Sequence, residues 1–207
     1  SAAAVAWLCG RASTVPAVVA TAALLAAARA FCDYTTSGLE TPLTYLLLVG
    51  FVAVVLSDAE PVARYTRAVL LAALLATNRM DLALLCLPAV LATMRGVPWR
   101  ARILRGSVAS LPFVLWVAFA TAYYGSPFPV TAHAKAFGTG IPAADVAMQG
   151  LRYIGHAAAT DPALLLVVAA GAPALAAARR TRWLALGCLL YAGYVVRVGG
   201  DFMQGRF

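Results

Sequence analysis

Four polar stretches interrupt an otherwise apolar sequence, and they hold the side chains best suited to chemistry. They are residues 33–40, 78–81, 127–135 and 199–207. The ionisable candidates in them are Asp33, Glu40, Arg79, Asp81, Lys135, Asp201 and Arg206. Carboxylates can deprotonate a hydroxyl group or hold sugar hydroxyls or a cation, whereas arginine and lysine bind phosphate oxygens.

Arg79 and Asp81 lie in the short sequence NRMD, with apolar sequence on both sides. In one interpretation they form an internal ion pair that pins a turn, and loss of either leaves the other charge unpaired. In the other, Arg79 binds an anion at membrane depth, because a guanidinium makes two parallel hydrogen bonds to phosphate oxygens. The residues alone leave both interpretations open.

The stretch from Asp33 to Glu40 is predicted as a polar loop that opens a helix at Thr41, with Pro42 in the first turn. Its two acids are either solvated or ligands for sugar hydroxyls or a cation. No metal site is expected at His133 and His156, which no cysteine accompanies. The cysteines lack metal-ligand spacing and are expected to act as small apolar residues; they are Cys9, Cys32, Cys86 and Cys188.

The composition indicates that the elements which position these side chains belong to a membrane protein. The chain has 207 residues, of which 63% are hydrophobic and 12% charged, and its mean hydropathy is +0.84. A soluble domain has about 25% charged residues, so a cytosolic globule is excluded. The net charge of +8 comes from short basic clusters between apolar runs, which is the positive-inside pattern of membrane proteins rather than a nucleic-acid-binding face.

Five apolar segments are expected to cross the membrane as helices, since about 20 residues span the hydrocarbon and lipid offers no hydrogen-bond partners. They are residues 14–31, 42–57, 107–123, 163–178 and 183–198. Residues 1–10 are expected to end an earlier helix. In the loop 124–162, Pro142 precedes a polar stripe at helical spacing, which predicts an amphipathic helix in the membrane interface or a packed surface helix. The stripe is Asp145, Gln149, Arg152 and His156.

Residues 64–94 are predicted to form a hairpin of two short helices, about 66–77 and 80–94, joined by the polar NRMD apex. Each arm would rise only about half the bilayer thickness, roughly 16 Å. The hairpin is preferred to a single span because it places ten of the 16 basic residues on the inner side. These are Arg11, Arg64, Arg67, Arg95, Arg100, Arg102, Arg105, Arg179, Arg180 and Arg182. All four polar stretches then face one outer compartment.

The order and approximate separation of four stretches resemble those in the actinobacterial terminal β-1,2 arabinofuranosyltransferases. The stretches are TTSGLE, the arginine–x–acid apex, the segment from YYG to the AK at Lys135, and GGDFMQGR. These enzymes belong to the membrane-embedded glycosyltransferase C superfamily, and the resemblance covers about residues 30–207. It departs at the apex, where Met80 stands in place of the family's proline. The resemblance implies an all-α polytopic membrane protein, a partial glycosyltransferase C-type helix bundle with a re-entrant helix pair and an interfacial helix.

The resemblance also implies the function. Such enzymes transfer arabinofuranose from decaprenyl-phosphate to a cell-wall polysaccharide on the extracytoplasmic face of the bacterial plasma membrane. Residues 1–207 would form one transmembrane domain of a longer protein, whose catalytic base lies in an outer loop upstream of Ser1 and whose outer C-terminal domain follows.

Roles for the candidate residues follow from the expected reaction. Arg79, Arg206 and Lys135 are expected to bind the donor phosphate. Asp33, Glu40, Asp81 and Asp201 are expected to hold sugar hydroxyls or a divalent cation, which is the one cofactor that these residues suggest. Among the residues present, Asp201 and Asp33 are the candidates for the base. The alternatives are a transporter or channel subunit, although no inverted repeat is visible, and a non-catalytic membrane scaffold.

Overall fold

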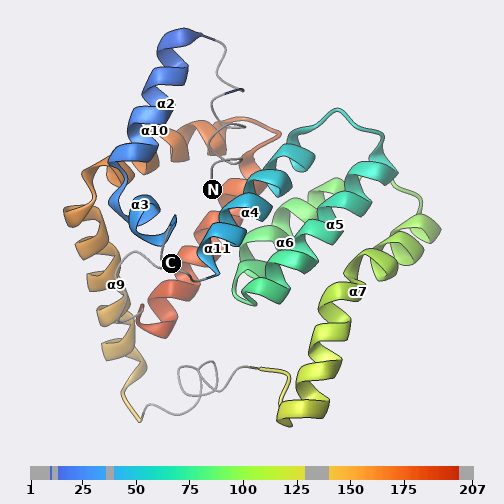
Figure 1. Cartoon of the computed structure of the whole chain (residues 1–207). Helices are drawn as coiled ribbons and strands as arrows, with labels where there is room; N and C mark the ends of the chain where they lie inside the picture. The colour runs from blue at the N-terminus through green and yellow to red at the C-terminus, as the bar shows by residue number, and fades with distance from the viewer. Residues whose placement is uncertain (1–9, 11–13, 36–39, 129–139, 201–207) are drawn as a thin grey trace.

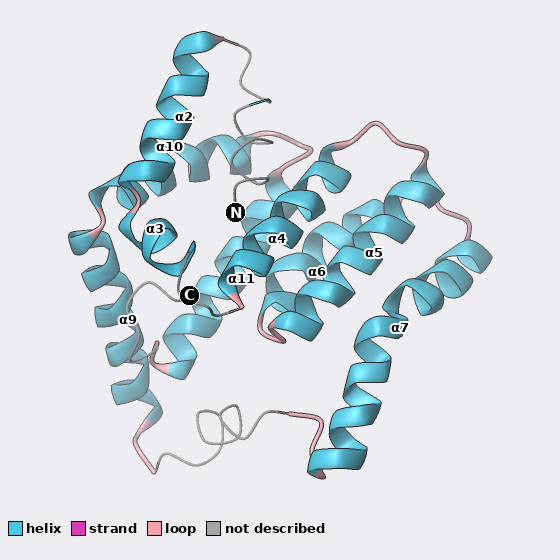
Figure 2. Ribbon diagram, in the orientation of Figure 1, coloured by secondary structure: helices cyan, strands magenta, loops and turns pink. Residues whose placement is uncertain are grey.

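The structure, a computed structural model, describes residue 10 and residues 14–35, 40–128 and 140–200. Within these ranges the regular secondary structure is entirely helical and contains no strand (Figures 1 and 2), which confirms the predicted all-α fold. The helices are α2 (Val15–Ala27), α3 (Arg29–Thr35), α4 (Thr41–Leu56), α5 (Pro61–Asn78), α6 (Leu82–Thr93), α7 (Trp99–Tyr124), α9 (Ala143–Thr160), α10 (Pro162–Ala177) and α11 (Arg182–Val198).

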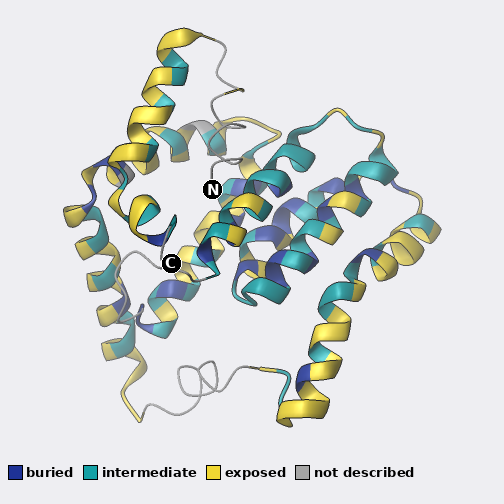
Figure 3. Ribbon diagram, viewed as in Figure 1, coloured by how far each residue is buried: buried dark blue, intermediate teal, exposed yellow. Residues whose placement is uncertain are grey.

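The hydrophobic core lies where α4, α5, α6 and α11 pack together (Figure 3). Phe51 of α4 and Leu75 of α5 have no exposed surface, and Leu184 of α11 belongs to the same cluster. Cys86 is buried among them as a small apolar side chain, as predicted. We call these four helices the four-helix core.

Helices α5 and α6 form an antiparallel hairpin, because only residues 79–81 separate them and the two helices pack against each other (Figure 1). This confirms the hairpin predicted for residues 64–94 and excludes the single straight helix. We call the end of the four-helix core that carries this turn the apex, and the opposite end the base.

The first arm of the hairpin is longer than the predicted 66–77. Helix α5 begins at Pro61 because the Glu60 carboxylate accepts hydrogen bonds from the backbone N–H groups of Val62 (3.0 Å) and Ala63 (2.9 Å). The same two bonds lower the pKa of Glu60 below its ordinary value. The 18 residues of α5 rise about 27 Å, so the arm is much longer than half a bilayer. The signal for the earlier start is the Glu60–Pro61 pair, an N-cap residue followed by proline in the first turn.

One described helix, α7, is long and apolar enough by itself to cross a membrane. Two pairs pass the same test only when joined: α2 with α3, which bend by 71°, and α9 with α10, which bend by 106°. The predicted span 14–31 is not one continuous helix, because the chain turns at Ala28 between α2 and α3. Whether this bent pair crosses the membrane as one span remains a prediction. The described part contains one candidate span, or up to three if each bent pair counts as one. Five crossings remain a prediction.

Helix α7 has 26 residues and exposes large apolar side chains along its length. It packs against α5, where the Tyr65 hydroxyl donates a hydrogen bond to the Arg102 carbonyl oxygen (3.0 Å). Gly106 makes room for that hydroxyl, since a Cβ there would lie 2.5 Å from it. A helix apolar on its outer surface suits a lipid environment.

Helix α9 confirms the helix predicted after Pro142, and all four residues of its polar stripe are exposed. The larger apolar side chains Met148, Leu151 and Ile154 are exposed as well. The buried face is a third one, centred on Gly150, where an added Cβ would come within 2.6 Å of the Val196 backbone in α11. Packing on α11 thus uses a glycine of α9, and placement in the membrane interface remains a prediction.

A second glycine sets the position of α11 across α6. An added Cβ on Gly187 would overlap the carbonyl oxygen of Leu85, which is backbone and cannot rotate away. Four residues later on the same face of α11, Tyr191 reaches Asp81, which lies four residues before Leu85. The two helices therefore run antiparallel in close contact, and the glycine determines which α11 side chain arrives at the apex.

We expect Gly187→Ala to lower the free energy of unfolding by about 1–3 kcal/mol, because the new methyl group must push α11 away from α6. The measurement is thermal or denaturant unfolding of the protein in detergent micelles. Gly193→Ala in the same helix is the matched control, because a Cβ there meets no atom within 4 Å. Equal stabilities of the two variants would contradict the close packing.

Candidate functional site

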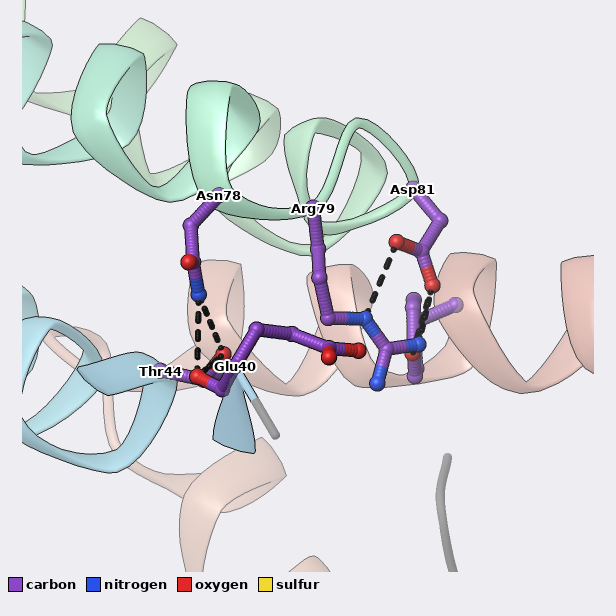
Figure 4. Close-up of polar contacts among 6 residues, drawn as sticks. Glu40, Thr44, Asn78, Arg79 and Asp81 are labelled. Atoms are coloured by element: carbon purple, nitrogen blue, oxygen red, sulfur yellow. Dashed lines mark hydrogen bonds and ion pairs between the residues drawn. The ribbon is translucent and has the colours of Figure 1, made fainter. Parts of the chain in front are cut away.

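Six residues from the start of α4, the end of α5, the α5–α6 turn and α11 meet at the apex through polar contacts (Figure 4). Helix α4 contributes its first turn, the α5–α6 turn contributes the central residues, and α11 contributes one side chain. We call them the apex cluster: Glu40, Thr44, Asn78, Arg79, Asp81 and Tyr191. The cluster brings together three of the residues that the sequence singled out, Glu40, Arg79 and Asp81.

The centre of the apex cluster is the ion pair between Arg79 and Asp81. The guanidinium donates through Nε to Oδ1 (3.3 Å) and through Nη2 to Oδ2 (2.6 Å), so the carboxylate is bound at both oxygens. The two side chains are only 11% and 12% exposed. Because little water reaches either charge, each depends on the other for compensation.

Tyr191 joins α11 to this ion pair. Its hydroxyl accepts a hydrogen bond from Arg79 Nη2 (3.0 Å) and donates one to Asp81 Oδ2 (2.9 Å). Tyr191 is not among the residues that the sequence pattern indicated. The available signal was its spacing of four residues from Gly187, which places a small residue and a polar-tipped aromatic residue on one helix face.

Asn78 ties the end of α5 to the start of α4. Its Nδ2 donates to Thr44 Oγ1 (2.8 Å) and to the carbonyl oxygen of Glu40 (3.1 Å). The Thr44 hydroxyl donates to the same carbonyl oxygen (3.2 Å). With its backbone held in this way, Glu40 extends its carboxylate toward the guanidinium of Arg79 (Figure 4), and the two charges attract each other.

The charges of the apex cluster are one guanidinium and two carboxylates, from Arg79, Glu40 and Asp81. Their sum is negative, so these three groups together favour hydroxyl or cationic ligands over a phosphate. The internal ion pair, which was one of the two interpretations of NRMD, is formed. Phosphate binding by Arg79 remains a prediction.

Asp33 is not joined to the apex cluster by any of these contacts. It lies on helix α3, where the sequence analysis expected a loop, and its side chain is 64% exposed. Its ion pair is with Arg29 on the preceding turn (3.6 Å), a contact that contributes little in water. Lys135, Asp201 and Arg206 lie outside the described residues.

One buried acid has a structural role that the sequence did not indicate. Asp161 follows α9 and is 5% exposed. Its carboxylate accepts a hydrogen bond from the backbone N–H of Ala30 in α3 (3.2 Å). It thereby connects the α2–α3 pair to the junction of α9 and α10.

Among the described residues, no group of three or more histidine, cysteine or acidic side chains lies close enough together to hold a metal ion. His156 is exposed on α9, and His133 lies outside the described part. The search for relatives found no family model, no characterised protein and no solved structure that matches the chain.

We expect Asp81→Asn to lower the free energy of unfolding by about 3 kcal/mol, because it removes the carboxylate that binds the enclosed Arg79 guanidinium directly and leaves only Glu40 as a counter-charge. The double variant Arg79→Met/Asp81→Leu should lose less, since it removes both charges and keeps apolar volume. Unfolding in detergent micelles measures both. Asp58→Asn is the matched control: it breaks the Arg180–Asp58 pair, whose side chains are 67% and 81% exposed, and should cost less than about 1 kcal/mol. If the double variant is as unstable as Asp81→Asn, the loss of stability does not come from the unpaired Arg79 charge, which would contradict the role given to the ion pair.

Proposed function

We propose that the chain is the membrane part of a glycosyltransferase, which moves a sugar from a polyprenyl-phosphate donor to a glycan acceptor. The observation that carries the proposal is the apex cluster, in which an enclosed guanidinium lies among two carboxylates and a tyrosine at one end of an apolar helical core. The resemblance to the arabinofuranosyltransferases suggests arabinofuranose as the sugar and a cell-wall polysaccharide as the acceptor.

The two ends of α7 support a membrane setting and an orientation. Its C-terminal end carries a series of neighbouring aromatic rings, with Phe119 and Tyr123 stacked at 5.4 Å and Tyr123 against Tyr124 at 4.8 Å. Its N-terminal end carries exposed Arg100 and Arg105. Aromatic belts occur at membrane interfaces, and basic residues gather on the cytoplasmic side. We therefore place the base inside and the apex on the extracytoplasmic side.

In the proposed reaction, the oxygen of an acceptor hydroxyl bonds to the anomeric carbon while the bond between that carbon and the donor phosphate oxygen breaks. The polyprenyl phosphate leaves with the bonding electron pair, and the hydroxyl proton passes to a carboxylate base. The sugar passes through an oxocarbenium-like state, as in glycoside hydrolysis. A guanidinium aimed at the departing phosphate stabilises the charge that develops there. We assign this role to Arg79.

The charge of the apex cluster places a condition on this assignment. Because two carboxylates already face Arg79, a phosphate needs further positive charge nearby to bind. In the proposal, Lys135 and Arg206 supply it, or a divalent cation held by Glu40 and the donor does. Glu40 and Asp81 then orient sugar hydroxyls, and the base is a carboxylate outside the apex cluster.

A non-catalytic scaffold is the second candidate, and the bonds that Arg79 already makes to Asp81 and Tyr191 favour it. A channel through the four-helix core has no such support. Its described interior between apex and base is apolar, with Phe51, Leu75 and Leu184 buried there. Ions would find no polar partners along that route.

We expect Arg79→Gln to lower kcat/KM for donor turnover about 100-fold or more, since it removes a charge that stabilises the leaving phosphate. Turnover of a polyprenyl-phosphate sugar is measured with the full-length protein in liposomes. Arg152→Gln, an exposed arginine on α9, is the matched control and should retain activity.

The double variant Arg79→Met/Asp81→Leu distinguishes a loss of folding from a loss of catalysis, because it removes both charges and keeps the volume of the turn. If this variant unfolds at the temperature of the unchanged protein and still turns over donor at a similar rate, Arg79 has no role in the reaction and the scaffold is favoured.

A further inference from the structure

At the base, arginines from separate elements surround a hollow of about 130 Å³. Ser57 ends α4, Arg64 lies in the first turns of α5, Arg95 follows α6, and Arg179 and Arg180 precede α11. Trp183 of α11 completes one wall. We call this hollow the arginine pocket. It lies at the opposite end of the four-helix core from the apex cluster and shares no residue with it.

The positive charge of the arginine pocket is largely uncompensated. Arg180 is paired with Asp58 (2.6 Å), at the exposed rim. Arg64 donates to the carbonyl oxygen of Ser57 (3.3 Å), and its Nε is buried without a hydrogen-bond partner. Within the described residues, no acid forms an ion pair with Arg64, Arg95 or Arg179.

The nearest remaining acid in sequence does not change this balance. Glu60 is exposed, and its carboxylate is occupied by the backbone N–H groups at the start of α5. Like charges held together cost stability unless an anion lies between them. A buried guanidinium N–H without an acceptor points to the same missing partner.

We infer that the arginine pocket binds the phosphate of an anionic phospholipid headgroup. Guanidinium groups bind phosphate oxygens through paired hydrogen bonds, and basic pockets between helices on the cytoplasmic side take up such headgroups. The hollow of about 130 Å³ is well above the roughly 15 Å³ that one water requires. It therefore has room for a phosphate group.

The position of Trp183 favours a lipid headgroup over free phosphate as the ligand of the arginine pocket. Arg95 and Arg182 both lie 5.3 Å from its ring, and tryptophan flanked by arginines is typical of the headgroup level. On α7, which also begins at the base, Trp99 is 64% exposed and Arg100 lies 5.5 Å from its ring. The acyl chains of a bound lipid would continue along the apolar helices.

The test compares two triple variants of equal charge by native mass spectrometry in detergent with added phosphatidylglycerol. Arg64→Gln/Arg95→Gln/Arg179→Gln removes the pocket, and Arg67→Gln/Arg100→Gln/Arg105→Gln removes three exposed arginines outside it. We expect affinity for phosphatidylglycerol to fall at least about tenfold further in the pocket variant than in the control, because each basic contact contributes severalfold. Equal losses would show general charge attraction and overturn the pocket.

Two further arms complete the test. The double variant Arg95→Gln/Arg179→Gln keeps the Arg64 contact to Ser57 and is used if the triple variant does not fold. Its affinity for phosphatidylglycerol should still fall further than that of the control variant. Inorganic phosphate at the same concentration should not displace the lipid; if it does, or if zwitterionic phosphatidylcholine binds equally well, the anionic lipid assignment is wrong.

Discussion

A charged pair in an environment with little water controls the organisation of the apex. Arg79 and Asp81 are adjacent to long apolar helices, and loss of either charge leaves the other without its directly bonded partner. Their separation by one residue lets the turn of the hairpin close while both carboxylate oxygens are bound. The same pair then attracts α11, whose Tyr191 hydroxyl bonds to both partners. The α5–α6 turn and the position of α11 therefore depend on one interaction.

The two ends of the four-helix core have opposite electrostatic character. Carboxylates outnumber the guanidinium among the charged groups of the apex cluster, whereas four arginines surround the hollow at the base. An apolar interior separates them. In a membrane protein, such an asymmetry determines orientation, because anionic lipids and the positive-inside rule act on the basic end. The proposed sugar transfer and the proposed lipid contact would then occur on opposite faces, each using the chemistry available there.

The ion pair gives the apex cluster both a structural and a chemical interpretation. A guanidinium bound on one edge by Asp81 and Tyr191 is rigidly oriented, which is what a group aimed at a developing charge requires. The neighbouring Glu40 carboxylate, held by the Asn78 and Thr44 contacts to its backbone, is oriented as well. Such preorganisation is compatible with catalysis, but it is equally what a stable scaffold needs. The distinction depends on whether a phosphate can compete for Arg79.

The sequence by itself determined the helical class, the hairpin at residues 64–94 and the grouping of Glu40, Arg79 and Asp81 at one end. These follow from local properties: hydropathy, the positions of the basic clusters and a polar interruption between apolar runs. Only the tertiary structure decided that the chain turns at Ala28, that Asp33 lies on a helix and pairs with Arg29, and that Tyr191 bonds to the ion pair. The physical reason is that hydropathy and charge pattern determine neither where a helix bends nor which distant helices pack together. The Tyr191 contact, for example, depends on the close approach of Gly187 to the Leu85 backbone.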